Sequence, residues 1–182
     1  MRFRLFAVLI AAFLSVCAQA SAYAASAPLA LDPDHKLPNA GRPEQRVAFP
    51  AIRDWRSLKI SLRRTRCFGR CPSYTVEISG DGAVAWTGEA FVQAVGARHA
   101  RIPVAKVKTL YRAFREAQFF WTLDIYRARI TDLPTYTVSI SYDDHAKSVI
   151  DYAGMAIGMP QEIVGLEQLI DKTANDARWI GP

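Results

Sequence analysis

The chain has 182 residues and a net charge of +6 at pH 7. Arg2 and Arg4 supply two of these charges, so +4 remains for the rest of the chain, an ordinary value for solubility that gives no evidence of nucleic-acid binding. The sequence lacks a phosphate-binding loop, a His-Glu-x-x-His helix and a Gly-x-Ser-x-Gly turn, which argues against the enzyme classes that carry these motifs.

The N-terminal residues have the order of a secretory signal peptide. An apolar run over residues 5–16 follows two arginines, and small residues follow it up to position 27. The run is shorter than the roughly twenty residues that a membrane-spanning helix needs. We therefore predict a signal peptide at residues 1–24, a periplasmic or secreted protein, and no stable membrane span after cleavage. A lipid anchor through Cys17 is the alternative, because a short apolar motif precedes this cysteine.

A Pro-rich arm or linker is predicted at residues 25–56. Five prolines recur between positions 28 and 50 among Asp, Asn, Gly and Arg, without a sustained apolar period. Such a composition buries too little apolar surface to offset the entropy of ordering. A single globular domain is predicted at residues 57–180.

The first half of this domain has the pattern of β-hairpins. Apolar residues alternate with polar ones over 58–63 and again over 74–79, and Gly80-Asp81-Gly82 is typical of a tight turn before the pattern resumes. A further strand is predicted within 91–102, where Gly96 interrupts it.

The second half combines two helices with another hairpin. Pro103 suits a helix start, and apolar residues then recur every three or four positions up to Ala117. Strands are predicted over 136–142 and 147–152, and a last helix from Pro160 to Ala174. The predicted fold class is α+β, an antiparallel sheet built from β-hairpins with two amphipathic helices packed on it.

Seven basic residues fall between positions 53 and 70, opposed by Asp54 alone. Strict alternation places Arg64 on the apolar side of its strand. We expect either a bulge there or an ion pair between Arg64 and a carboxylate, with three candidates: Asp132, Asp124 and Asp151.

The most specific motif is the cysteine loop. The run from Arg64 to Val76, with Cys67-Phe68-Gly69-Arg70-Cys71-Pro72 at its centre, resembles the signature of a bacterial family catalogued as domain of unknown function 6438. The resemblance covers about residues 57–172. It implies an α+β domain of exported or envelope proteins, and it implies no activity or catalytic residues.

Two functions remain open for this loop. In an oxidising compartment Cys67 and Cys71 are expected to pair, which makes the domain a non-catalytic binding or structural module of the cell envelope. Its partner would be a protein or an anionic envelope component, and nucleic acid is not expected. The candidate binding residues are Arg64, Arg66, Phe68 and Arg70.

The alternative is a thiol-dependent copper-binding or redox protein, because Cys-x-x-x-Cys-Pro also resembles the copper loop of the Sco-type chaperones. Two thiolates and a histidine suit copper, and His99 and His145 are the candidate further ligands, with His35 in the arm. No cofactor is expected in the first interpretation.

Overall fold

The computed structural model describes residues 49–182. The predicted signal peptide, Cys17, His35 and most of the predicted arm lie outside the described residues. None of the helices in the described part of the chain is long and apolar enough to cross a bilayer.

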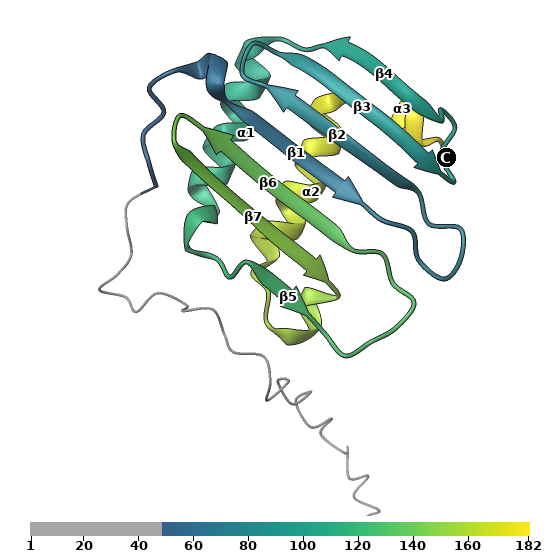
Figure 1. Cartoon of the computed structure of the whole chain (residues 1–182). Coiled ribbons are helices and arrows are strands. Elements are labelled where there is room, and N and C mark those ends of the chain that lie inside the picture. Colours follow the sequence, from purple (N-terminus) through teal and green to yellow (C-terminus); the bar gives the residue numbers. More distant parts are fainter. Residues whose placement is uncertain (1–48) are drawn as a thin grey trace, which may run out of the picture.

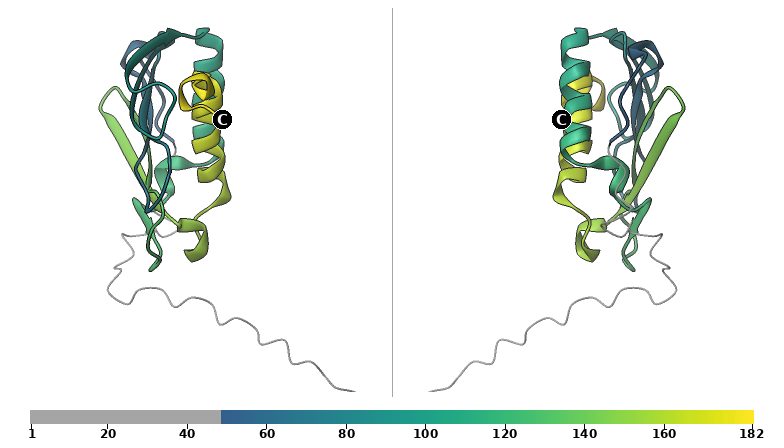
Figure 2. Two further views of the ribbon diagram at one scale, coloured as in Figure 1. Left: turned by 90° about the vertical axis from the view of Figure 1, so that its right-hand side faces the viewer. Right: turned by 90° about the vertical axis from the view of Figure 1, so that its left-hand side faces the viewer.

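The domain is a seven-stranded sheet with helices packed on one face (Figures 1 and 2). The strands are β1 (Lys59–Arg64), β2 (Ser73–Ser79), β3 (Ala83–Ala90), β4 (Gly96–Arg101), β5 (Ile125–Arg127), β6 (Tyr136–Tyr142) and β7 (His145–Tyr152). The helices are α1 (Val104–Glu116), α2 (Gln161–Ala174) and the short α3 (Ala177–Ile180). Three 3-10 turns complete the fold: η2 (Trp55–Ser57), η3 (Phe119–Trp121) and η4 (Gly154–Ile157).

The strand order is β4-β3-β2-β1-β6-β7-β5, and each neighbouring pair is antiparallel except β5 with β7, which is parallel. The predicted α+β class and its hairpin-built sheet are therefore confirmed. Because β1, β3, β5 and β7 all run in one direction, the connections that follow them lie at one end of the sheet. We call this end the loop end.

The core lies between the sheet and the helices. Alternate residues of β1 and β2 face the helices and are fully buried, as are Val107, Leu110 and Phe114 of α1. Full burial of one large apolar side chain contributes about 1.5–3 kcal/mol. This two-layer core holds the sheet rigid and leaves its other face to solvent.

The contacts of the globular unit extend to the N-terminal side of residue 57. The ring of Phe49 packs edge-on against Tyr111, and the Tyr142 hydroxyl donates to the Pro50 carbonyl at 2.9 Å. The Asp143 carboxylate accepts the backbone N–H of Arg53 at 2.8 Å. Residues 49–57 thus pack on the sheet beside the β6–β7 turn.

Some local details differ from the predicted elements. The parallel strand β5 and the helix α3 were not predicted, because three or four residues are too few to show a period. Gly96 begins β4 instead of interrupting it, with φ of +84°. His145 belongs to β7, and the turn before it consists of Asp143 and Asp144, where Asp143 takes the left-handed conformation.

Candidate functional site

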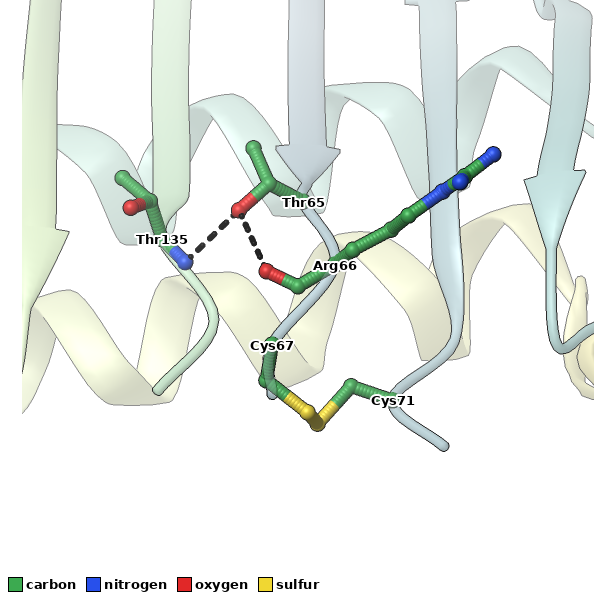
Figure 3. The surroundings of a disulfide bond; sticks show 5 residues. All are labelled: Thr65, Arg66, Cys67, Cys71 and Thr135. Carbon is green, nitrogen blue, oxygen red and sulfur yellow. Dashed lines mark hydrogen bonds between the residues drawn. A yellow bond between two sulfur atoms is a disulfide. The ribbon is translucent and has the colours of Figure 1, made fainter. Parts of the chain in front are cut away.

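A disulfide closes the cysteine loop, residues 65–72, between the end of β1 and the start of β2. Cys67 and Cys71 are bonded, and their Cα atoms are 5.6 Å apart. The loop lies at the loop end of the sheet (Figure 1), and Figure 3 shows its disulfide. The predicted pairing of the two cysteines is confirmed.

Hydrogen bonds fasten the cysteine loop to the connection between β5 and β6, residues 128–135. Thr65 donates its backbone N–H to the Thr135 carbonyl at 3.0 Å, and Thr135 returns its N–H to the Thr65 hydroxyl at 3.0 Å (Figure 3). The backbone N–H of Phe68 donates to the Asp132 carbonyl at 3.3 Å. The disulfide and these bonds together hold the loop against its neighbour.

Three of the four predicted binding residues project from this loop into solvent. Phe68 is 87% exposed, and Arg66 and Arg70 are exposed as well. The Arg66 side chain points away from the disulfide (Figure 3). The loop therefore presents an aromatic ring between two cations on a closed backbone.

Arg64 lies on the other side of the sheet from solvent and is not part of this exposed group. The register of β1 continues without a bulge through Arg64, which is opposite Tyr74 on one side and Tyr136 on the other. Its guanidinium stacks on the Tyr136 ring, 5.1 Å from the centroid, and its buried Nε has no hydrogen-bond partner within residues 49–182.

The predicted ion pair of Arg64 does not form among the described residues, so that expectation was wrong. Asp132 lies in an exposed connection, Asp124 pairs with Lys147, and the Asp151 carboxylate accepts the Gly154 N–H at 2.6 Å. The aromatic ring of Tyr136 takes the place of a carboxylate because it is the direct cross-strand neighbour of Arg64.

A cluster of four carboxyl groups lies near Arg64, between the sheet and α2. We call it the carboxyl cluster, and its members are Asp151, Glu167, Asp171 and Asp176. Asp176 is fully buried, while Glu167 and Asp151 are 6% and 8% exposed. This cluster was not predicted from the sequence. The one feature that could have indicated it is the position of Glu167, four residues after Ile163 and three before Ile170, on the buried face of the helix.

Burial governs the protonation of the cluster. Burial raises the pKa of Glu167 to about 8, and the adjacent Asp151 carboxylate raises it further. Burial, together with Asp171, likewise raises the pKa of Asp176 to about 8. Both groups are therefore largely protonated at neutral pH.

These protons satisfy oxygens that otherwise lack donors. Neither oxygen of Asp176 accepts a hydrogen bond from a described donor, so a proton on Asp176 that is donated to Asp171 serves both groups. A proton on Glu167 serves its pair with Asp151 in the same way. The Tyr74 hydroxyl donates to the Asp171 carboxylate at 2.8 Å, and burial raises the pKa of Tyr74 well above its ordinary value. The cluster thus consists of two hydrogen-bonded carboxyl pairs beneath the sheet, and Tyr74 bonds to the pair that contains Asp171.

The histidines named for the alternative metal site lie apart from the cysteine loop. His99 is on β4, three strands from β1, and His145 begins β7 at the end of the sheet opposite the loop end. Within residues 49–182 there is no group of three or more His, Cys, Asp or Glu side chains that could hold a metal ion.

A hollow of about 520 Å³ lies at the C-terminal end of α1, away from the cysteine loop. Its lining consists of Phe49, Arg112, Arg115, Glu116, Gln118 and Trp121. Trp121 belongs to the aromatic run that follows α1. The hollow contains none of the residues predicted as a site.

Comparison with protein families gives one match. A family model described as a domain of unknown function, DUF6438, matches residues 58–174, which is more than half of the chain. A search of curated proteins found no match. The family description names no activity, so any functional conclusion depends on the geometry of the site.

Proposed function

This chain belongs to the DUF6438 family, and on that premise we propose that it is a non-catalytic binding module of the bacterial cell envelope. The binding element is the cysteine loop, and its contact residues are Phe68, Arg66 and Arg70. The partner is a protein or an anionic component of the envelope.

The exposure of Phe68 carries this proposal. A phenylalanine that is 87% exposed buries almost none of its ring in the domain, although aromatic side chains gain most of their free energy from burial. An aromatic side chain with flanking arginines is also the composition that is enriched where proteins bind partners. Phe68 is therefore explained best by a contact that another molecule completes.

The closed loop supports binding in a second way. The loop is ordered before any partner binds. It is closed by a disulfide between cysteines four positions apart and held by two hydrogen bonds to the Thr135 backbone. Less conformational entropy is then lost on association, which favours affinity. The disulfide has a structural role in this proposal: it keeps Phe68 projecting.

The location in the envelope is supported by the signal-peptide pattern at residues 1–24 and by the disulfide, which is typical of oxidising compartments. The absence of catalysis is supported by the carboxyl cluster. Its raised pKa values resemble those of active-site acids, but Asp176 is fully buried and Glu167 and Asp151 are nearly so.

The thiol-dependent alternative needs a different state of the loop. Cys67 and Cys71 would have to be reduced before their sulfurs could bind copper, and neither His99 nor His145 is beside them. We keep this alternative as the outcome that a count of free thiols would reveal.

The test is co-sedimentation of the purified protein with isolated cell envelopes. We expect the wild type to sediment with envelopes, and the Arg66→Ala/Arg70→Ala and Phe68→Ala variants to stay in solution. The matched control is Arg56→Ala/Arg101→Ala, which removes the same charge at the opposite end of the strands and breaks only an exposed pair with Asp81. Equal sedimentation of all variants would contradict the proposal.

A further inference from the structure

Exposed apolar side chains gather at the loop end. Eight large hydrophobic residues are exposed within residues 49–182, and two of them, Val104 and Ile125, begin α1 and β5. The other six follow β1, β3, β5 and β7, and therefore lie at the loop end: Phe68, Phe91, Val95, Ile130, Leu133 and Met155. Their concentration at one end is not explained by packing within the domain.

Three of these six residues lie on two connections that are hydrogen-bonded to each other. Phe68 in the cysteine loop is hydrogen-bonded through its backbone to the connection that carries Ile130 and Leu133, which are 39% and 42% exposed. Figure 1 shows the two connections projecting side by side from the sheet at the lower right, and the bond between Phe68 and Asp132 confirms that they touch. These three side chains form the apolar tip of the domain.

The same connections carry a positive charge. Residues 65–72, 91–95, 128–135 and 153–158 contain Arg66, Arg70 and Arg129 against Asp132 alone. Arg127, at the end of β5, adds an exposed cation that stacks on Tyr152. The apolar tip is thus bordered by cations, and the nearby Glu89 at the end of β3 is bonded to Ser73 and paired with Arg63.

We propose that the loop end docks on an anionic lipid bilayer. Phe68, Ile130 and Leu133 enter the headgroup region, and Arg66 and Arg70 contact lipid phosphates. This inference rests on the proposed function, because it takes the cysteine loop as the binding element and names its partner.

The shape and chemistry of the tip favour a bilayer over a protein. Its apolar side chains stand on protruding connections, and the hollow lined by Phe49 and Trp121 lies elsewhere, at the C-terminal end of α1. Protruding aromatic and aliphatic groups suit the soft interface of a bilayer, and basic residues beside them are attracted by anionic headgroups. Arginine also binds phosphate oxygens with its planar fork of donors.

The disulfide has a specific part in this docking. It closes the backbone from Cys67 to Cys71 into a ring, which restricts the conformations that the backbone at Phe68 can adopt. Membrane binding should therefore weaken on reduction even while the domain stays folded.

The experiment is vesicle co-sedimentation of the protein isolated in its processed form. The vesicles contain phosphatidylglycerol and phosphatidylcholine, or phosphatidylcholine alone. All variants share one N-terminus, so any contribution from the residues before Phe49 is equal in each. We expect Arg66→Ala/Arg70→Ala to reduce affinity for anionic vesicles about tenfold or more, and Phe68→Ala/Leu133→Ala by about tenfold.

The controls are Arg56→Ala/Arg101→Ala and Val104→Ala, which remove two arginines and one exposed apolar side chain away from the loop end and should bind like the wild type. An unfolding midpoint equal to that of the wild type verifies that each variant is folded. Equal binding to neutral vesicles, or equal binding by all variants, would overturn the inference.

The outcome also separates this inference from the proposed function. If envelopes retain the wild type but not the loop variants, while anionic vesicles retain neither, the partner is an envelope component other than phospholipid and the lipid inference is wrong. If neither envelopes nor vesicles retain the wild type, both fail.

Discussion

The cysteine loop and the carboxyl cluster lie on either side of Arg64 and use ionisable groups in opposite ways. Arg66 and Arg70 remain charged in solvent, where their charge costs little and is available to a partner. Glu167 and Asp176 are buried, and they meet the cost of burial by holding protons. Raised pKa values thus mark the buried interior of this molecule, while the exposed groups at the loop end are the candidates for binding.

The largest expected effect is the pH dependence of stability. The carboxyls of Glu167 and Asp176 have ordinary pKa values near 4 when unfolded and about 8 when folded, so between these values the folded state binds more protons. Their stabilisation is complete below about pH 4 and is lost as pH rises through 8. We expect each of the two groups to lower the free energy of unfolding by on the order of 4 kcal/mol between pH 5 and pH 9.

Urea unfolding across this range measures the effect. Glu167→Gln and Asp176→Asn should each reduce the dependence of the unfolding free energy on pH, since an amide does not titrate. Glu116→Gln, on the exposed side of α1, should leave this dependence unchanged. A stability that stays level or rises up to pH 9 would show that the cluster is ionised and paired in some other way.

The second effect is loss of the disulfide. Cys67→Ser/Cys71→Ser should reduce the free energy of unfolding by about 2 kcal/mol, toward the lower end of the usual range, because the ring is short. The dependence of the unfolding free energy on pH should not change, since the loop lies outside the carboxyl cluster. Urea unfolding of the wild type with and without reductant provides the control, and a variant as stable as the oxidised wild type would contradict a structural role.

A smaller effect is expected from Tyr74→Phe. This change removes the donor to the Asp171 carboxylate and leaves a buried acceptor, at a cost of about 1–2 kcal/mol near neutral pH. Because the Tyr74 hydrogen bond lowers the pKa of Asp171, its loss should raise that pKa further and shift the stability profile. Tyr152→Phe is the matched control, since no described group bonds to its hydroxyl. If stability depends on pH in the same way in both variants, Tyr74 does not interact with the carboxyl cluster.

The smallest effect on stability is expected at the loop. Arg66→Ala/Arg70→Ala should change the free energy of unfolding by less than about 0.5 kcal/mol, because both side chains are exposed. Thermal unfolding measures this. A large loss of stability would mean that the arginines support the fold, and any loss of envelope binding would then have an indirect cause.

Regular periods made much of the fold predictable. Apolar and polar residues alternate clearly in β1, β2 and β6, and apolar residues recur every three or four positions in α1. These patterns are strong because each element buries one face against a single core. β5 has three residues and depends on its parallel pairing with β7, which no local pattern reveals.

Of the candidate site, only the exposed part, the cysteine loop, could be predicted from the sequence. Cys67, Cys71 and Phe68 are adjacent in sequence, so the motif itself placed them together. Arg64 was placed correctly on the helix side, but its aromatic partner Tyr136 depends on the pairing of β1 with β6. The carboxyl cluster combines β7, α2 and the residue before α3, and only tertiary packing brings these together.

We expect the cysteine loop to be a closed structural element and no reactive dithiol. Thiol titration of the protein purified without reductant, before and after reduction, with copper analysis of the same sample, tests this expectation. We expect no reactive thiol and no bound copper before reduction, and two thiols from Cys67 and Cys71 afterwards. Two reactive thiols in the untreated protein, or one copper ion per chain, would contradict it and make the two cysteines the active centre.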